Sequence, residues 1–76
     1  MSAEKLVRMA NQIADFFRSQ PDEAAVEGSA DHIRSYWNPV MRREIYAYMD
    51  AGGAGLNDLA RRALDRLRSV DPAAPK

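Results

Sequence analysis

The residue best suited to acid–base chemistry in this 76-residue chain is His32, its only histidine, which directly follows Asp31. An imidazole titrates near neutral pH and can act as a general base. Neighbouring residues on a helix do not face each other, so Asp31 is poorly placed to orient His32. A single histidine also cannot form a two-histidine metal site. We therefore expect His32 to be an ordinary polar helix residue.

Other residue types used in catalysis and cofactor binding are missing or lack the required spacing. The chain has no cysteine, so it can form no disulfide, thiolate nucleophile or conventional iron–sulfur cluster. No serine lies in a nucleophile-elbow motif. The segment Gly52-Gly53-Ala54-Gly55 lacks the lysine that follows a phosphate-binding loop. We expect no catalytic, cofactor-binding or metal site in this chain.

The arginines raise the possibility of nucleic-acid binding. Four of them fall on the last predicted helix: Arg61, Arg62, Arg66 and Arg68. However, Asp58 and Asp65 share that helix's polar surface, where four-residue spacing predicts the pairs Asp58–Arg62 and Arg61–Asp65. The net charge of the chain is also zero. Residues 1–31 carry three bases and six acids, whereas residues 32–70 carry seven bases and four acids. Such polarity is more often solvated surface than a binding site, so a DNA-binding or regulatory adaptor module is the less favoured alternative.

Stop and start signals divide the chain into four short helices, which predicts an all-α fold in a single small domain over residues 1–70. The helices are expected near residues 2–18, 22–37, 39–51 and 57–70, and residues 71–76 are expected to form a disordered tail. Candidate N-cap residues precede or open each helix: Ser2, Asp22 or a neighbour of it, Asn38 and Asn57.

The strongest of these boundaries is Asn38-Pro39. Proline fixes its own φ and disfavours helical conformation in the residue before it, so one helix should end near Trp37. Asn38 can then cap the next helix, with Pro39 as its first residue. This arrangement places the only tryptophan at a corner between two helices.

Helical periodicity gives each segment an apolar face. The first helix has a broad face that suits contact with two neighbours: Leu6, Val7, Met9, Ala10, Ile13, Ala14, Phe16 and Phe17. The second has a stripe from Val26 to Trp37, beside a small-residue patch around Gly28 where another helix could approach closely. The helix at 39–51 is apolar on several sides, with Tyr46 apart from its main face. A chain this short has little interior, which favours a helix shared with a partner.

Nothing in the sequence resembles a secretory signal or a membrane span. The N-terminal segment is amphipathic and lacks a continuous apolar run. We therefore expect a cytoplasmic protein with no membrane association.

Several ordered blocks resemble the delta subunit of NAD-dependent formate dehydrogenase. They are Glu4-Lys-Leu-Val-Arg-Met-Ala-Asn-Gln-Ile-Ala-Asp-Phe-Phe17, Ala25-Val, Asp31-His-Ile-Arg34, Trp37-x-Pro39, Met41-Arg42 and Gly55-Leu56-x-x-Leu59-Ala. The resemblance spans about residues 4 to 67. It implies a small non-catalytic subunit of a cytoplasmic enzyme that oxidises formate with NAD, with a docking, assembly or stabilising role on the large (alpha) catalytic subunit.

The same resemblance implies that the redox groups lie on other subunits: a molybdenum or tungsten pterin cofactor, iron–sulfur clusters, FMN and NAD. It also focuses attention on the corner. We hypothesise that Trp37, Pro39, Met41 and Arg42 form a partner-binding anchor, because Trp and Arg are frequent interface hot spots. The alternative is that Trp37 is the core tryptophan of the domain, since it continues the buried stripe from Val26.

Overall fold

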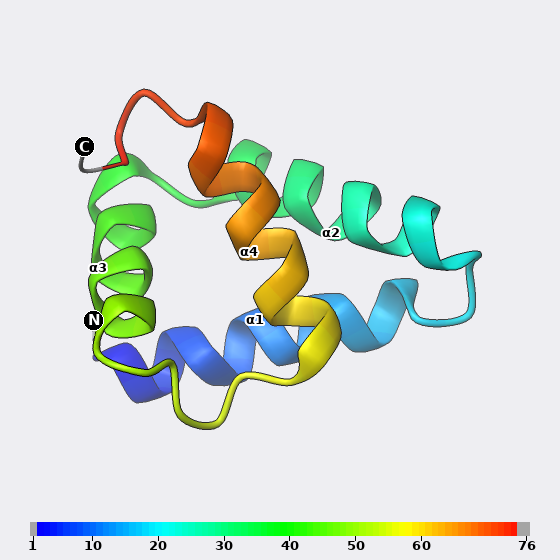
Figure 1. Ribbon diagram of the computed structural model, residues 1–76, viewed down its shortest axis with the longest axis horizontal. Helices are drawn as coiled ribbons and strands as arrows, with labels where there is room; N and C mark the ends of the chain where they lie inside the picture. Colours follow the sequence, from blue (N-terminus) through cyan, green and yellow to red (C-terminus); the bar gives the residue numbers. More distant parts are fainter. Residues whose placement is uncertain (1, 75–76) are drawn as a thin grey trace.

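The computed structural model of the chain describes residues 2–74 and consists of four helices (Figure 1). They are α1 (Ala3–Phe17), α2 (Asp22–Tyr36), α3 (Pro39–Asp50) and α4 (Asp58–Val70). The all-α prediction is confirmed, and the helix boundaries lie close to those expected from the sequence. Among residues 2–74, no helix combines the length and the hydrophobicity that a membrane-spanning segment requires.

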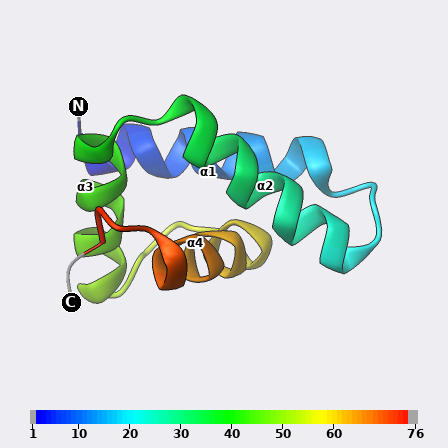
Figure 2. The same cartoon turned by 90° about the horizontal axis from the view of Figure 1, so that it is seen from above.

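The helices enclose one core. α1 and α2 form an antiparallel pair, α4 packs against both, and α3 lies across the end of the pair where α1 begins and α2 ends (Figures 1 and 2). The largest fully buried apolar side chains come from all four helices: Leu6, Ile33, Ile45, Tyr46 and Leu64. The broad apolar face of α1 is explained by its position, because α1 contacts each of the other three helices.

Three of the four candidate N-caps are confirmed. The side-chain oxygens of Ser2, Asn38 and Asn57 each accept a hydrogen bond from the backbone N–H three residues later, at 3.3, 2.9 and 2.7 Å respectively. The start of α2 differs, because Pro21 occupies the N-cap position without a side-chain bond. Asp22 is the first residue of that helix, and its carboxylate instead accepts hydrogen bonds from Arg62 on α4 at 2.7 and 2.8 Å.

Helix α3 buries one face and leaves apolar side chains exposed on others, as expected of a helix that is apolar on several sides. Ile45, Tyr46 and Met49 are buried, and Tyr46 is fully enclosed rather than lying apart. Val40 and Ala47, on other sides of the helix, are exposed. Burial of Tyr46 leaves no polar group unsatisfied, because its hydroxyl has a buried hydrogen-bond partner, described below.

The connection from α3 to α4 is fastened by side chains from two helices. Asn11 on α1 donates to the Gly55 carbonyl at 2.9 Å and accepts from the Asn57 N–H at 2.9 Å. Arg61 on α4 donates to the Gly53 carbonyl at 2.9 Å. Gly53 has a φ of 63°, a conformation that glycine adopts at little cost. The side chain of Asn11 thus forms its hydrogen bonds within the chain.

The segment after α4 is attached to the core, at least as far as the structure describes it. Asp71, which the sequence assigns to a disordered tail, is buried. Its carboxylate accepts a hydrogen bond from the Ala73 N–H at 2.9 Å, and Ala74 packs against the core. Pro75 and Lys76, the rest of the predicted tail, lie outside the described residues.

Candidate docking groove

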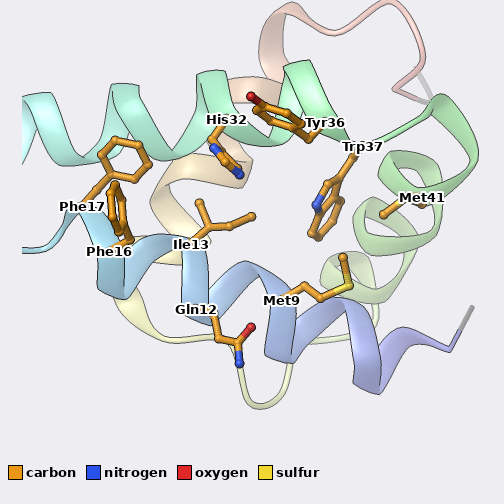
Figure 3. A pocket seen from close by; sticks show the side chains of 9 residues that line it. All are labelled: Met9, Gln12, Ile13, Phe16, Phe17, His32, Tyr36, Trp37 and Met41. Atoms are coloured by element: carbon orange, nitrogen blue, oxygen red, sulfur yellow. The ribbon is translucent and has the colours of Figure 1, made fainter.

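An open groove of about 530 Å³ runs between α1 and α2 and reaches the start of α3 (Figure 3). Nine side chains line it: Met9, Gln12, Ile13, Phe16, Phe17, His32, Tyr36, Trp37 and Met41. Phe16 and Phe17 lie at one end, and Trp37 lies at the other (Figure 3). None of the nine is an acid, a lysine or an arginine, so the groove presents mainly aromatic, aliphatic and thioether surface.

The position of the Phe17 ring at one end of the groove depends on Gly28, which lies on the neighbouring helix α2. A Cβ atom at Gly28 would lie 2.7 Å from two ring carbons of Phe17, so the ring can occupy this position only because residue 28 has no side chain. This confirms that Gly28 marks a close approach between helices. The approach is internal, between α1 and α2.

Phe16 is far more exposed than its neighbour Phe17 and more exposed than the sequence predicts. Periodicity assigns it to the core face, yet it is 77% exposed. Its ring meets that of Phe17 edge-on at a centroid distance of 5.2 Å, so Phe17 lies between it and the core. Tyr36, on the facing edge of the groove, is 74% exposed. Two large aromatic side chains therefore face solvent on opposite edges of one groove.

The rings between these two edges form a continuous row. His32 lies 6.3 Å from Phe17 and 4.5 Å from Tyr36 between ring centroids, and it is tilted by 33° against Tyr36. His32 thus packs in an aromatic wall. The sequence predicts an ordinary polar helix residue, and the structure places His32 on α2 as an exposed residue whose ring lies between those of Phe17 and Tyr36.

The four residues of the hypothesised anchor separate into two pairs. Trp37 and Met41 line the groove, although Trp37 is only 4% exposed and belongs to the core cluster. Pro39 is exposed but is not part of the groove lining. Arg42 points inward and bonds to Asp71. Without a partner present, most of the Trp37 side chain is buried, which agrees with the alternative that it is the core tryptophan of the domain.

Arg42, Tyr46 and Asp71 form a buried polar cluster behind the Trp37 end of the groove. Arg42 Nε and the Tyr46 hydroxyl both donate to Asp71 Oδ2, at 2.7 and 2.6 Å. Burial alone would raise the pKa of Asp71, but hydrogen bonds from Tyr46, the Ala73 N–H and Arg42 outweigh it and hold the pKa below its usual value. Burial and the bond to Asp71 raise the pKa of Tyr46. At neutral pH the cluster therefore contains an ionised aspartate and a neutral tyrosine.

Comparison with known proteins identifies the family. The family model described as NADH-dependent formate dehydrogenase delta subunit FdsD matches residues 5–64. The chain belongs to the FdsD family. No curated protein and no solved structure matches it in the corresponding searches.

Family membership makes this chain a small subunit of an NAD-dependent formate dehydrogenase complex, as the sequence resemblance implies. The matched residues contain the whole groove lining and Arg42. The match ends within α4, and Asp71 follows it. The buried cluster thus joins the family-matched part of this FdsD-family chain to residues beyond it.

The arginines that raised the DNA-binding alternative have partners within the chain. Arg62 bonds Asp22 and Asp58, and Arg66 bonds Glu23 at 2.8 Å. These bonds raise the pKa of both guanidinium groups. The other two, Arg61 and Arg68, bond loop carbonyls and the carboxylates of α3 and α4, respectively. The spacing-based pairing of Arg62 with Asp58 is confirmed, whereas Arg61 binds the glycine loop rather than Asp65.

The described residues of this FdsD-family chain hold no group of three or more His, Asp or Glu side chains arranged to bind a metal ion. The groove, which is suited to contact with another surface, and the buried cluster next to Trp37 are the candidate functional features of this part of the chain.

Proposed function

We propose that this chain is a non-catalytic subunit that docks on the large catalytic subunit of a cytoplasmic formate dehydrogenase complex and supports its assembly or stability. The observation that carries the proposal is the open aromatic groove between α1 and α2. A chain in the delta-subunit family is expected to contact another subunit, and this groove is a concave, largely apolar surface that could form the contact.

The composition of the groove suits a protein interface. Aromatic residues and methionine are enriched at such interfaces, whereas lysine and acidic residues are depleted. Exposed apolar patches on small proteins commonly mark interaction sites. Phe16 and Tyr36 are exposed on facing edges of the groove, so a docked partner would bury a large apolar surface at both residues. Within the hypothesised anchor, Trp37 and Met41 contribute from the groove wall.

The residue types of the chain support a non-catalytic role. Without cysteine, it cannot ligate a conventional iron–sulfur cluster. We propose that the molybdenum or tungsten pterin cofactor, the iron–sulfur clusters, FMN and the NAD site all belong to partner subunits. The paired arginines of α4 favour this reading over a DNA-binding or regulatory adaptor, because phosphate contacts would have to displace existing carboxylate partners.

The test is co-purification of the large subunit with the full-length chain carrying Phe16→Ser and Tyr36→Ser. Both side chains are already exposed, so the free chain should remain folded while the amount of bound large subunit falls sharply. Val70→Ser is the matched control, because Val70 is 71% exposed but lies outside the groove. Recovery of the large subunit in equal amounts with the double variant and the control would refute docking through the groove.

A further inference from the structure

Arg42 holds three separate parts of the chain together. Its Nε donates to Asp71 Oδ2 at 2.7 Å, and its Nη1 donates to the Trp37 carbonyl at 2.6 Å. Its Nη2 lies 3.5 Å from Asp71 Oδ1. One side chain on α3 thus connects Trp37, the C-cap residue of α2, to Asp71, the residue that follows α4.

The Trp37 carbonyl needs such a donor. The last carbonyls of a helix have no partner within the helix. The chain beyond Trp37 cannot continue α2, and Pro39 has no N–H to offer. The guanidinium of Arg42 satisfies the carbonyl, and Asp71 fixes the guanidinium in turn. The ion pair is well enclosed, with the two side chains 12% and 1% exposed.

We infer that the Arg42–Asp71 pair is a latch that sets the position of Trp37 and so the shape of the docking groove. The residues after α4 therefore belong to the docking apparatus, although they lie beyond the family-matched part of the chain. Arg42 and Asp71 are positioning residues, because they affect docking only by fixing Trp37, which lines the groove. This inference rests on the proposed function, because it gives the latch a role in docking.

Trp37 is the only tryptophan, so its fluorescence reports the latch without a partner present. Asp71→Asn preserves the shape of the side chain but removes its charge. We expect the emission of Trp37 to shift to longer wavelength and to become more accessible to acrylamide, with helical circular dichroism retained. Asp58→Asn is the control, because it removes an exposed α4 carboxylate that bonds Arg62 and should leave both signals unchanged.

The second readout is the affinity of the full-length chain for the large subunit prepared without it. If the released corner occupies the docking geometry about one tenth of the time, the affinity of Asp71→Asn should fall about tenfold. Arg42→Lys provides a variant that retains the charge opposite Asp71. A lysine ammonium lacks the planar fork that bridges Asp71 and the Trp37 carbonyl, so this variant should shift the fluorescence and weaken binding as well.

The outcomes separate the two claims. Wild-type fluorescence and affinity in folded Asp71→Asn and Arg42→Lys would overturn the latch. If Phe16→Ser with Tyr36→Ser abolishes docking while the latch variants bind normally, only this inference fails. If that double variant docks normally, the proposed function fails, and the docking role of the latch fails with it. If Asp71→Asn does not fold, the Arg42→Lys fluorescence and affinity decide the matter.

Discussion

Two arginine–aspartate pairs in this molecule have the same N–O distance and very different surroundings. Arg42–Asp71 and Arg62–Asp22 each measure 2.7 Å. The side chains of the first pair are 12% and 1% exposed, and those of the second are 42% and 71% exposed. The first closes the corner between α2 and α3, whereas the second lies on the surface between α2 and α4.

The difference shows that distance alone does not determine what an ion pair contributes. At the surface, water and salt screen the attraction, and each partner is well solvated when the other is removed. In the interior, the loss of one partner leaves a charge without solvent or counter-charge, and the penalty is large. The buried pair should therefore control local structure, whereas the surface pair should have little effect.

The largest expected effect is that of Asp71→Ala. It leaves the Arg42 guanidinium enclosed without its carboxylate, which should lower the free energy of unfolding by about 3–5 kcal/mol. Urea unfolding followed by circular dichroism provides the measurement, with Asp22→Ala as the matched variant at the surface. Because Asp22 is exposed, its removal should leave the unfolding midpoint almost unchanged. Equal shifts in the two variants would contradict the comparison.

Acid should remove part of the same contribution. The folded-state pKa of Asp71 lies below its usual value, so its ionised form stabilises the fold above the unfolded-state pKa of about 3.9. That stability is lost as pH falls through the lower, folded-state pKa. The stability difference between wild type and Asp71→Asn should therefore be constant near neutral pH and shrink below about pH 4. Urea midpoints across this range test it, and a difference that persists unchanged in acid would exclude the charge as its source.

Sequence reasoning succeeds for features that depend on residues close together in the chain. Signals confined to a few residues were read correctly: the Asn38 cap before Pro39, the Asn57 cap, and the pairing of Arg62 with Asp58 four residues earlier. An interior glycine costs helix stability unless packing requires it, and Gly28 accordingly marks a close approach between helices. The Val26-to-Trp37 stripe likewise predicted the buried position of Trp37.

Contacts between residues far apart in the chain leave no comparable short-range pattern in the sequence. Arg42 and Asp71 are 29 residues apart, and Asp71 sits in a Pro- and Ala-containing stretch that is typical of a frayed end. Periodicity could not separate Phe16 from Phe17 either, because that choice depends on the space at Gly28 on another helix. The sequence therefore predicts only the corner at Trp37 and not the groove that the corner borders.

A smaller effect is expected for Tyr46→Phe, which tests the second donor to Asp71. The variant removes only the hydroxyl bond of 2.6 Å and keeps the buried ring. A hydrogen bond to a charged group contributes about 1.5–3 kcal/mol, so the loss should be smaller than that of Asp71→Ala. Thermal or urea unfolding checks the value. Tyr48→Phe is the control, since its hydroxyl bonds an exposed loop carbonyl instead. A loss as small as that of the control would mean that Arg42 and the Ala73 N–H satisfy Asp71 without the Tyr46 hydroxyl.

The smallest expected effect is that of salt on the surface pairs, and it distinguishes the two regions most directly. At about 1 M ionic strength the screening length falls to ~3 Å, so exposed pairs should lose what they contribute at low salt. Any slight destabilisation by Asp22→Asn with Glu23→Gln should therefore vanish in urea titrations at high salt. The destabilisation by Asp71→Ala should remain, because ions cannot enter the enclosed site around Arg42. If salt removed both effects alike, the Arg42–Asp71 pair would be open to solvent and could not hold the Trp37 wall in place.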